Sequence, residues 1–156
     1  MQVEDLMTKD VSFCIPSTST AAAAELMWTR DCGVLPVVGD SDRVVGIVTD
    51  RDLFIALGTS NRSASELPVG EIMQREPAVC ASDDDVRSAL RTMAERQIHR
   101  LPVVDKSGAL EGILSMNDIV LKAKPGTDGV FKDDVIRTLK AICEHRQPAQ
   151  SKQATA

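Results

Sequence analysis

The feature of this sequence that most constrains its fold is an internal duplication at an offset of 66 residues. When the chain is aligned with itself at this offset, 14 of the 53 residues from Val3 to Ile55 are identical to their counterparts, and no insertion is needed. The run Leu-Pro-Val-Val at residues 35–38, for example, returns unchanged at residues 101–104. A repeat of this size indicates units that cannot bury their apolar faces alone. We therefore expect two similar halves that pack against each other with pseudo-twofold symmetry.

Each half has the pattern of a β-α-β-β-α unit. In the first half, residues 11–15 are rich in β-branched and aromatic side chains and predict a short strand. Residues 21–30 predict a helix because they are mostly strong helix formers. Residues 35–38 and 44–48 are two apolar runs joined by a polar turn, which is typical of a hairpin, and residues 50–57 predict the closing helix. The predicted fold class is α+β.

The second half copies this pattern, and one further helix follows it. Residues 82–96 and 117–123 predict the two helices of this half, and residues 101–104 and 109–114 predict its hairpin. Residues 130–144 place apolar side chains on one face, as in an amphipathic helix. The predicted regions are repeat 1 at residues 1–60, repeat 2 at 61–124, and a C-terminal helix with a disordered tail at 125–156.

Charge and hydropathy narrow the classes of function. The net charge of −5 at pH 7 argues against a nucleic acid as the main partner, because a nucleic-acid backbone calls for a basic surface. No apolar run approaches the roughly 20 residues that span a bilayer, and the N-terminal residues lack the basic and apolar regions of a signal peptide. We therefore expect a cytoplasmic protein that does not associate with membranes.

The cysteines and histidines do not have the spacing of a metal or catalytic site. Cys14, Cys32, Cys80 and Cys143 lie far apart, and only Cys143 has a histidine nearby, His145. No metal is therefore predicted. With only two histidines, no nucleophile and base at a recognisable spacing and no phosphate-binding loop, no catalytic residue is predicted either.

Both halves carry a hydroxyl residue three places before an acid, where the last strand runs into the closing helix. The pairs are Thr49 with Asp52 and Ser115 with Asp118. One interpretation is a capping box that satisfies backbone N–H groups at the helix start. The other is a nucleotide site, because a hydroxyl, a carboxylate and free backbone donors at a helix start can hold a sugar and a phosphate. One copy alone would favour the cap, and the second copy shifts the weight towards the nucleotide site.

The order of the motifs resembles a known family. The first half begins with Val-x-x-Leu-Met-Thr at residues 3–8, continues with Leu-Pro-Val-Val, and ends with Gly-Ile-Val-Thr-x-x-Asp at residues 46–52. This pattern is similar to the CBS domain, and the pair, over about residues 3–123, resembles a Bateman module. The run Lys-Ala-Ile-Cys at residues 140–143 is also similar to hypoxic-response members among the small stand-alone bacterial proteins of this family.

The resemblance implies two clefts that bind an adenosine ligand. In nucleotide-binding members of the family, the acid of the final motif holds the ribose hydroxyls, and the Thr or Ser reaches the ribose or the phosphate. Carried over, these residues are Asp52 with Thr49 in one cleft and Asp118 with Ser115 in the other. A carboxylate suits this role because it can accept hydrogen bonds from two vicinal hydroxyls.

The family also builds each cleft from both repeats. The residues implied opposite Asp118 are Thr8, Ser12, Phe13, Cys32 and Gly33. Those implied opposite Asp52 are Gln74, Ala78, Val79, Ile98 and His99. His99 and Arg100 stand where family members often place basic residues towards phosphates, whereas the matching pair in the first repeat is Gly33 and Val34. The two clefts therefore differ at this position.

The function that the resemblance implies is a non-enzymatic regulatory module that binds AMP, ADP or ATP in interdomain clefts. Such a module would report adenylate status to an effector protein, which the sequence does not identify, and the family commonly forms homodimers. Two alternatives stay open. The same clefts could bind S-adenosylmethionine or NAD, or the chain could be a ligand-free structural or redox-responsive homodimer in which Cys14 and Cys80, or Cys32, are oxidised.

Overall fold

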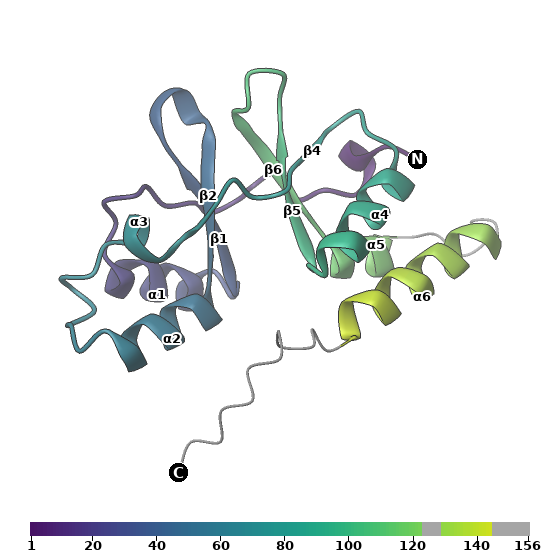
Figure 1. Ribbon diagram of the computed structural model, residues 1–156. Coiled ribbons are helices and arrows are strands. Elements are labelled where there is room, and N and C mark those ends of the chain that lie inside the picture. Colours follow the sequence, from purple (N-terminus) through teal and green to yellow (C-terminus); the bar gives the residue numbers. More distant parts are fainter. Residues whose placement is uncertain (123–128, 145–156) are drawn as a thin grey trace, which may run out of the picture.

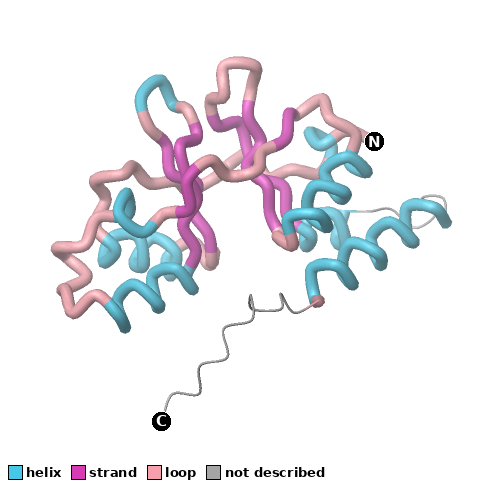
Figure 2. Tube along the Cα trace, viewed as in Figure 1, coloured by secondary structure: helices cyan, strands magenta, loops and turns pink. Residues whose placement is uncertain are grey.

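The chain folds into two lobes that stand side by side (Figures 1 and 2). The computed structural model describes residues 1–122 and 129–144, so the predicted tail lies outside the described residues. The α+β class is confirmed, because each lobe contains one three-stranded sheet with helices packed against it. In Figure 1 the two hairpins stand next to each other in the middle, and the helices lie on the outer flanks.

The first lobe is built mainly from the first repeat. Its sheet has the order β1-β2-β3, and three helices accompany it. The bounds are β1 Val34–Val38, β2 Val44–Thr49, β3 Gln74–Arg75, α1 Thr20–Thr29, α2 Asp50–Thr59 and α3 Val69–Ile72. Strong helix formers fill most of α1, and the Ser19 hydroxyl caps it by accepting a hydrogen bond from the Ala22 N–H.

The second lobe repeats this arrangement and adds a helix. Its sheet has the order β4-β5-β6, with β4 parallel to β5. The bounds are β4 Cys80–Ala81, β5 Arg100–Val104, β6 Leu110–Ser115, α4 Val86–Arg96, α5 Met116–Lys122 and α6 Gly129–Cys143. The two hairpins match in register, since Val34 faces Thr49 in one and Arg100 faces Ser115 in the other. They also touch each other, because the Val44 N–H donates to the Gly108 carbonyl at 3.0 Å.

The start of each repeat crosses over to the lobe of the other repeat. Residues 74–75 form strand β3 on the first lobe, where Gln74 faces Ile47. In the equivalent place on the second lobe, Thr8 pairs with Ile113, with both backbone hydrogen bonds at 2.9 Å. The apolar side chains that precede these crossings are buried in the core of the opposite lobe. They are Val3 and Leu6 in the second lobe, and Val69 and Met73 in the first.

One predicted strand is shorter than expected. Residues 11–15 form only an isolated bridge, in which Cys14 pairs with Val37. The next residue does not extend the strand, because the Ile15 N–H donates to the Thr18 hydroxyl in the turn that leads into α1. In the second repeat the same segment extends to two residues as β4. A hydroxyl-rich turn directly after the bridge thus ends the pairing early in the first repeat.

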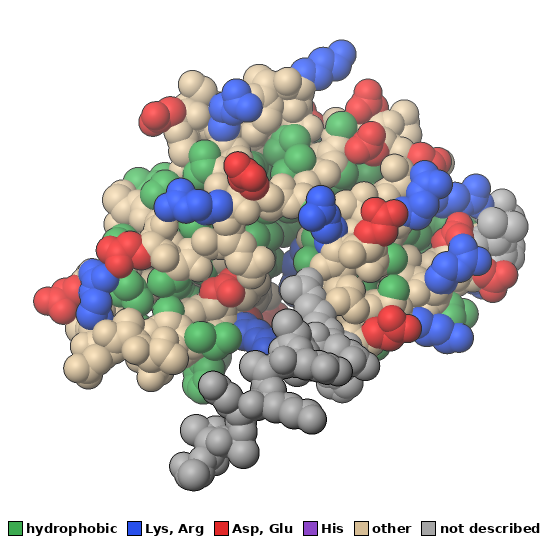
Figure 3. All heavy atoms as spheres, viewed as in Figure 1, with side chains coloured by type: hydrophobic (Ala, Val, Ile, Leu, Met, Phe, Trp, Pro, Cys, Tyr) green, Lys and Arg blue, Asp and Glu red, His purple; other side chains and the backbone are tan. Residues whose placement is uncertain are grey.

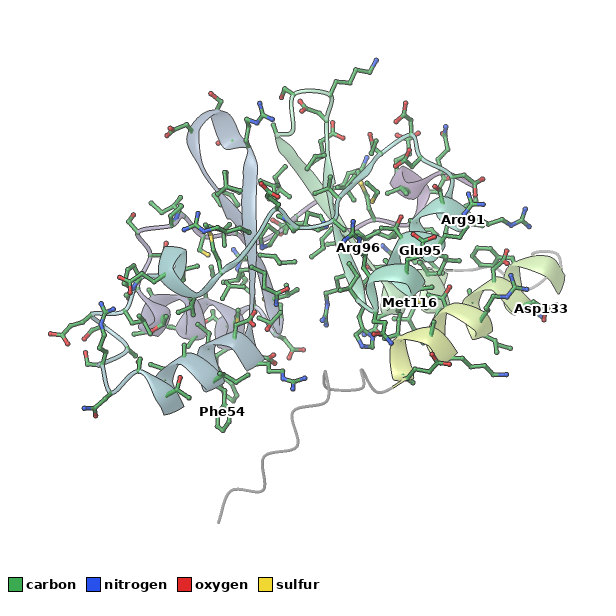
Figure 4. All side chains as sticks on the ribbon, viewed as in Figure 1. Phe54, Arg91, Glu95, Arg96, Met116 and Asp133 are labelled. Atoms are coloured by element: carbon green, nitrogen blue, oxygen red, sulfur yellow. The ribbon has the colours of Figure 1, made fainter. Side chains whose placement is uncertain are left out.

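Helix α6 packs along α4 of the second lobe, while Val120 and Leu121 on α5 of the same lobe stay exposed. Its Phe131 and Ile142 are buried in that core, and the Thr138 hydroxyl donates to the Leu90 carbonyl at 3.3 Å. No described segment covers the matching face of the first lobe, where the side chains of Trp28 and Phe54 are 88% and 79% exposed. Figure 4 shows Phe54 pointing away from α2, and Figure 3 shows hydrophobic side chains on the surface over this helix.

Candidate functional site

The junction between β2 and α2 holds Asp52 by contacts from both repeats. The Asp52 N–H donates to Thr49 Oγ1 at 3.1 Å, and Asp52 Oδ2 accepts from the Thr49 N–H at 2.9 Å and the Thr49 hydroxyl at 2.8 Å. These bonds form the predicted capping box. Gln74 Nε2, from the second repeat, donates to Oδ1 at 3.2 Å and to Oδ2 at 3.1 Å. The acid therefore caps the helix and also faces the opposite repeat.

The junction between β6 and α5 repeats this geometry around Asp118. Asp118 Oδ2 accepts from the Ser115 N–H at 3.0 Å and from the Ser115 hydroxyl, while the Asp118 N–H donates to Ser115 Oγ at 3.1 Å. Oδ1 accepts from the Thr8 hydroxyl at 3.2 Å and lies 3.4 Å from Lys122 Nζ. In both junctions one oxygen belongs to the cap, and the other is reached from the opposite repeat. The capping interpretation is thus compatible with a ligand site.

The pKa of Asp118 lies below its usual value. Partial burial of the carboxyl raises the pKa, but the hydrogen bonds from Ser115, the charge of Lys122 and the hydrogen bond from Thr8 together lower it. The carboxylate is therefore ionised at neutral pH and is available as a charged hydrogen-bond acceptor.

Each junction opens onto a cavity between the lobes. Cleft 1, of about 350 Å³, lies beside Thr49. It is lined by Val34, Ile47, Thr49, Gln74, Arg75, Glu76, Pro77, Ala78, Arg96, Gln97, Ile98, His99 and Arg100. Cleft 2, of about 410 Å³, lies beside Ser115 and Asp118. It is lined by Thr8, Asp10, Val11, Ser12, Arg30, Asp31, Cys32, Val34, Arg100, Ile113, Ser115 and Asp118.

The two clefts are related by the internal duplication. At the offset of 66 residues, Thr8 matches Gln74, Arg30 matches Arg96 and Ser115 matches Thr49. Val34 and Arg100, which match each other, line both clefts. The clefts are therefore two copies of one site, and each is built from both repeats because the chain crosses between the lobes.

Most of the residues predicted for the site line these two clefts. In cleft 1 these are Thr49, Gln74, Ala78, Ile98, His99 and Arg100, and Asp52 is hydrogen-bonded to the lining residue Gln74. In cleft 2 they are Thr8, Ser12, Cys32, Ser115 and Asp118, with Arg100 again. The assignment of all these residues to ligand binding stays a prediction.

Besides Asp52, which contacts cleft 1 through Gln74, three predicted residues lie outside both linings. The side chains of Phe13 and Val79, which match at the offset of 66, are 49% and 41% exposed. Each follows a lining residue, Ser12 or Ala78, in an extended segment, where successive side chains point in opposite directions. Gly33 lies instead beside a surface depression of the first lobe, where an added Cβ would be 2.9 Å from an Asp50 carboxylate oxygen.

The sequence interpretation missed most of the charged residues of the clefts. They are Asp10, Arg30 and Asp31 in cleft 2, and Arg75, Glu76 and Arg96 in cleft 1. Only Arg30 and Arg96 carried a signal, because they are identical at the offset of 66 residues. The others depend on the chain path between the lobes, which the sequence pattern does not show.

The buried cysteines do not suit a redox role. The Cys14 and Cys80 thiols each lie 3.9 Å from a proline carbonyl, of Pro36 and Pro102 respectively. Burial raises the pKa of Cys14 to about 11, and burial with the nearby charge of Asp84 raises that of Cys80 to about 12. Since the thiolate is the reactive form, both are poor candidates for oxidation. Cys32 lines cleft 2, and all four thiols are free.

Residues 1–122 and 129–144 contain neither a metal-binding cluster nor a membrane-spanning helix. No three His, Cys, Asp or Glu side chains there are grouped in a way that could hold a metal ion. None of the helices in these ranges combines the length and the hydropathy required to cross a bilayer. His145, the one histidine close in sequence to a cysteine, lies outside the described residues.

Comparison with known proteins settles the family. The model of the CBS domain matches residues 3–59 and 69–124, which are the two repeats. The chain belongs to the CBS domain family. The tandem CBS pair expected from the motifs is thereby confirmed.

Relatives of this CBS pair include both an enzyme and a small stand-alone protein. The chain is 36% identical over 122 residues to inosine-5'-monophosphate dehydrogenase from Thermoplasma acidophilum, but the match covers 78% of this chain and only 23% of the dehydrogenase. It is 28% identical over 139 residues to hypoxic response protein 1 of Mycobacterium tuberculosis, which covers 89% of this chain and 92% of that protein. The similarity to the hypoxic-response type is thus confirmed.

Solved CBS-pair structures share the fold. CBSX2 from Arabidopsis thaliana in complex with AMP is 33% identical, with a TM-score of 0.68 over 78% of this chain and 95% of that chain. The CBS pair of protein MJ0100, in complex with 5'-methylthioadenosine and S-adenosyl-L-methionine, is 26% identical, with a TM-score of 0.70 over 78% and 94%. Hypoxic Response Protein I, with two coordinated zinc ions, is 28% identical, with a TM-score of 0.72 over 80% and 100%.

Proposed function

We propose that this CBS pair is a non-enzymatic regulatory module that binds an adenosine nucleotide, AMP, ADP or ATP, in one or both clefts. The observation that carries the proposal is the pair of acids, Asp52 and Asp118, each reached by a polar side chain of the opposite repeat beside a cavity. A ligand at this position touches both repeats at once. Its binding would therefore change how the lobes pack and could be read by an effector protein.

The acids have the free capacity that a ribose requires. In Asp52, Oδ2 serves the helix cap and also accepts from Gln74, while Oδ1 accepts only from the Gln74 amide among residues 1–122 and 129–144. A carboxylate oxygen has two lone pairs, so Oδ1 can accept from a ribose hydroxyl beside Gln74 or in its place. Such a bond is charge-assisted and about twice as strong as a bond between neutral groups. The cap keeps the carboxylate in position for this contact.

The relatives support an adenosine-type ligand. CBSX2 is solved with AMP, and the MJ0100 pair with 5'-methylthioadenosine and S-adenosyl-L-methionine. The second of these structures favours S-adenosylmethionine as the alternative ligand, and a ribose contact of this kind would also admit NAD. The volume of each cleft, about 350 and 410 Å³, is within the range of small-molecule sites. A cytoplasmic location, where adenosine nucleotides are abundant, is part of the proposal.

Calorimetric titration with AMP and ATP tests this function, with a thermal-shift panel that adds S-adenosylmethionine and NAD. A ligand that binds only the folded protein raises its melting temperature. Asp52→Asn and Asp118→Asn keep the shape of the side chain and a capping oxygen, and each is expected to weaken binding at its own cleft by about tenfold. Asp50→Asn is the matched control, because Asp50 is exposed in the same helical turn and does not line cleft 1. Unchanged binding in both variants would refute the site.

We also propose that the module is a homodimer that buries the exposed apolar side chains of α1, α2 and α5. These are Trp28, Phe54, Val120 and Leu121, all more than half exposed. Helices α1 and α2, which carry Trp28 and Phe54, pack against each other, and large apolar side chains exposed on neighbouring helices are typical of an interface. Phe54→Ser is expected to shift the protein from dimer to monomer in analytical ultracentrifugation. Ile136→Ser, at a half-exposed position on α6, serves as the control, and a wild-type monomer would contradict the proposal.

A further inference from the structure

The two clefts have the same architecture but opposite charge. Three arginines, Arg75, Arg96 and Arg100, line cleft 1, together with one acid, Glu76. A second acid, Asp52, is the counterpart of Asp118 and is hydrogen-bonded to the lining residue Gln74. Figure 4 shows Arg96 at the end of α4 that is nearer to the first lobe. Cleft 2 is lined by two arginines, Arg30 and Arg100, and by three acids, Asp10, Asp31 and Asp118. The formal charge of the lining is therefore positive in cleft 1 and negative in cleft 2.

The difference arises at particular positions of the repeat. Gln97 in cleft 1 is replaced by Asp31 in cleft 2, which exchanges a neutral amide for a carboxylate. Arg75 lines cleft 1, whereas its counterpart Lys9 is not among the lining residues of cleft 2. Arg100 lines both clefts and so does its apolar counterpart Val34, so this position adds the same single positive charge to each cleft. The duplication therefore kept one acid at each cleft, Asp52 or Asp118, and changed the charged residues around it.

The acids of cleft 2 are not all compensated. Lys122 Nζ lies 3.4 Å from Asp118 Oδ1 and offsets that charge. Asp10 and Asp31 are exposed, and within the described part of the chain their carboxylates have no hydrogen bond or ion pair. In cleft 1, Arg75 uses one nitrogen to donate to the Gly70 carbonyl at 3.0 Å, which leaves other guanidinium donors for a ligand. On the face shown in Figure 3, acidic and basic side chains are otherwise interspersed.

We propose that the clefts are specialised, so that cleft 1 binds the phosphorylated adenosine ligand and cleft 2 binds an adenosine compound without a phosphate. This inference rests on the proposed function and names the ligand class of each cleft. Guanidinium groups match phosphate oxygens in geometry and charge. The carboxylates of Asp10 and Asp31, which have no ion pair among the described residues, repel a phosphate from cleft 2. They do not repel a neutral 5' substituent, and they attract a cationic one.

Calorimetry with AMP and adenosine as the two probes tests this specialisation. AMP is expected to bind at one site per chain, with an affinity that falls as salt is raised, because the phosphate contacts are screened. Asp52→Asn should weaken the binding of AMP by about tenfold, and Asp118→Asn should leave it unchanged. For adenosine, Asp118→Asn should weaken binding at a site that AMP does not occupy.

Removal of the repelling charges provides the second measurement. The double variant Asp10→Asn with Asp31→Asn is expected to raise the affinity of cleft 2 for AMP by about tenfold, since each repulsion has roughly the size of an exposed ion-pair interaction. AMP should then bind at two sites per chain. The control is Asp40→Asn with Asp42→Asn, which removes the same charge from the exposed turn between β1 and β2.

The possible failures can be distinguished. If AMP occupies both clefts of the wild-type protein equally, or is lost only in Asp118→Asn, the specialisation is wrong although the proposed function stands. The same conclusion follows if the control raises the affinity for AMP as much as the double variant does. If AMP and adenosine do not bind but ADP or ATP does, the specialisation is wrong although the proposed function stands. If none of AMP, ADP, ATP and adenosine binds, the proposed function itself is refuted, and the specialisation with it.

Discussion

At the scale of single residues, the site depends on two acids that each cap a helix and also contact the opposite repeat. Asp52 and Asp118 each cap a helix with one oxygen and face the opposite repeat with the other. The hydroxyl-to-acid spacing revealed the cap, because capping is local in sequence. It could not reveal Gln74 or Thr8 as partners, because Thr8 and Asp118 are 110 residues apart. These contacts exist only once the lobes have packed.

The lowered pKa of Asp118 predicts how the stability of the folded protein depends on pH. Its pKa is lower in the folded protein than its usual value, so it stabilises the fold above that value and loses this effect as the pH falls through the lowered pKa. Asp118→Asn is expected to reduce the free energy of unfolding at pH 7 by about 1 kcal/mol, after an allowance for screening by solvent. Urea titrations from pH 7 to pH 3 check this. The difference between the two proteins should shrink below about pH 4, and a constant difference would contradict it.

The close packing of Gly112 against the backbone of Thr8 predicts that a larger side chain at this position destabilises the fold. A Cβ at this position would lie 2.8 Å from the backbone oxygen of Thr8, which cannot move without breaking its pairing with Ile113. Gly112→Ala is therefore expected to lower the free energy of unfolding by about 1–3 kcal/mol. Gly58→Ala, in open space within α2, should instead raise it by about 0.5–1 kcal/mol. Chemical denaturation of both variants measures this, and similar effects of the two changes would contradict it.

At the scale of elements, helix α6 makes the two lobes unequal. It packs along α4, and Gln97 Nε2 donates to the carbonyls of Ala141 and Glu144 at 3.0 and 3.1 Å, at the end of the helix. Gln97 also lines cleft 1, so the end of α6 is attached to the rim of that cleft. The amphipathic pattern predicted the helix. It could not show which lobe the apolar face covers, because both lobes have a similar helical face.

The burial of Phe131 predicts how strongly α6 is attached to the core of the second lobe. Its side chain is buried in the second core, so Phe131→Ala is expected to lower the free energy of unfolding by about 3–4 kcal/mol, or to detach the helix. Hydrogen exchange within α6 distinguishes these results, since a detached helix exchanges fast while α4 and β5 stay protected. Ile136→Ala, on the same helix but half exposed, should cost less than about 1 kcal/mol. An equal loss in the two variants would show that α6 is not held by its buried face.

At the scale of the whole molecule, the crossovers join the lobes into one unit. Val3 and Leu6 complete the core of the second lobe, and Val69 and Met73 complete that of the first. Neither lobe can therefore unfold without exposing apolar surface that belongs to the other repeat. We expect one cooperative transition, with equal calorimetric and van't Hoff enthalpies. Two separate transitions in scanning calorimetry would contradict this.

The sequence by itself determined the parts that repeat locally. These are the two hairpins in matching register, the helices between them and the two hydroxyl-acid junctions, because periodicity, turn residues and caps act over a few residues. Only the tertiary structure decided that the repeats exchange their first segments, that α6 covers one lobe, and that the clefts differ in charge. Those features depend on contacts between residues far apart in the chain, and such contacts form only when the two lobes pack together.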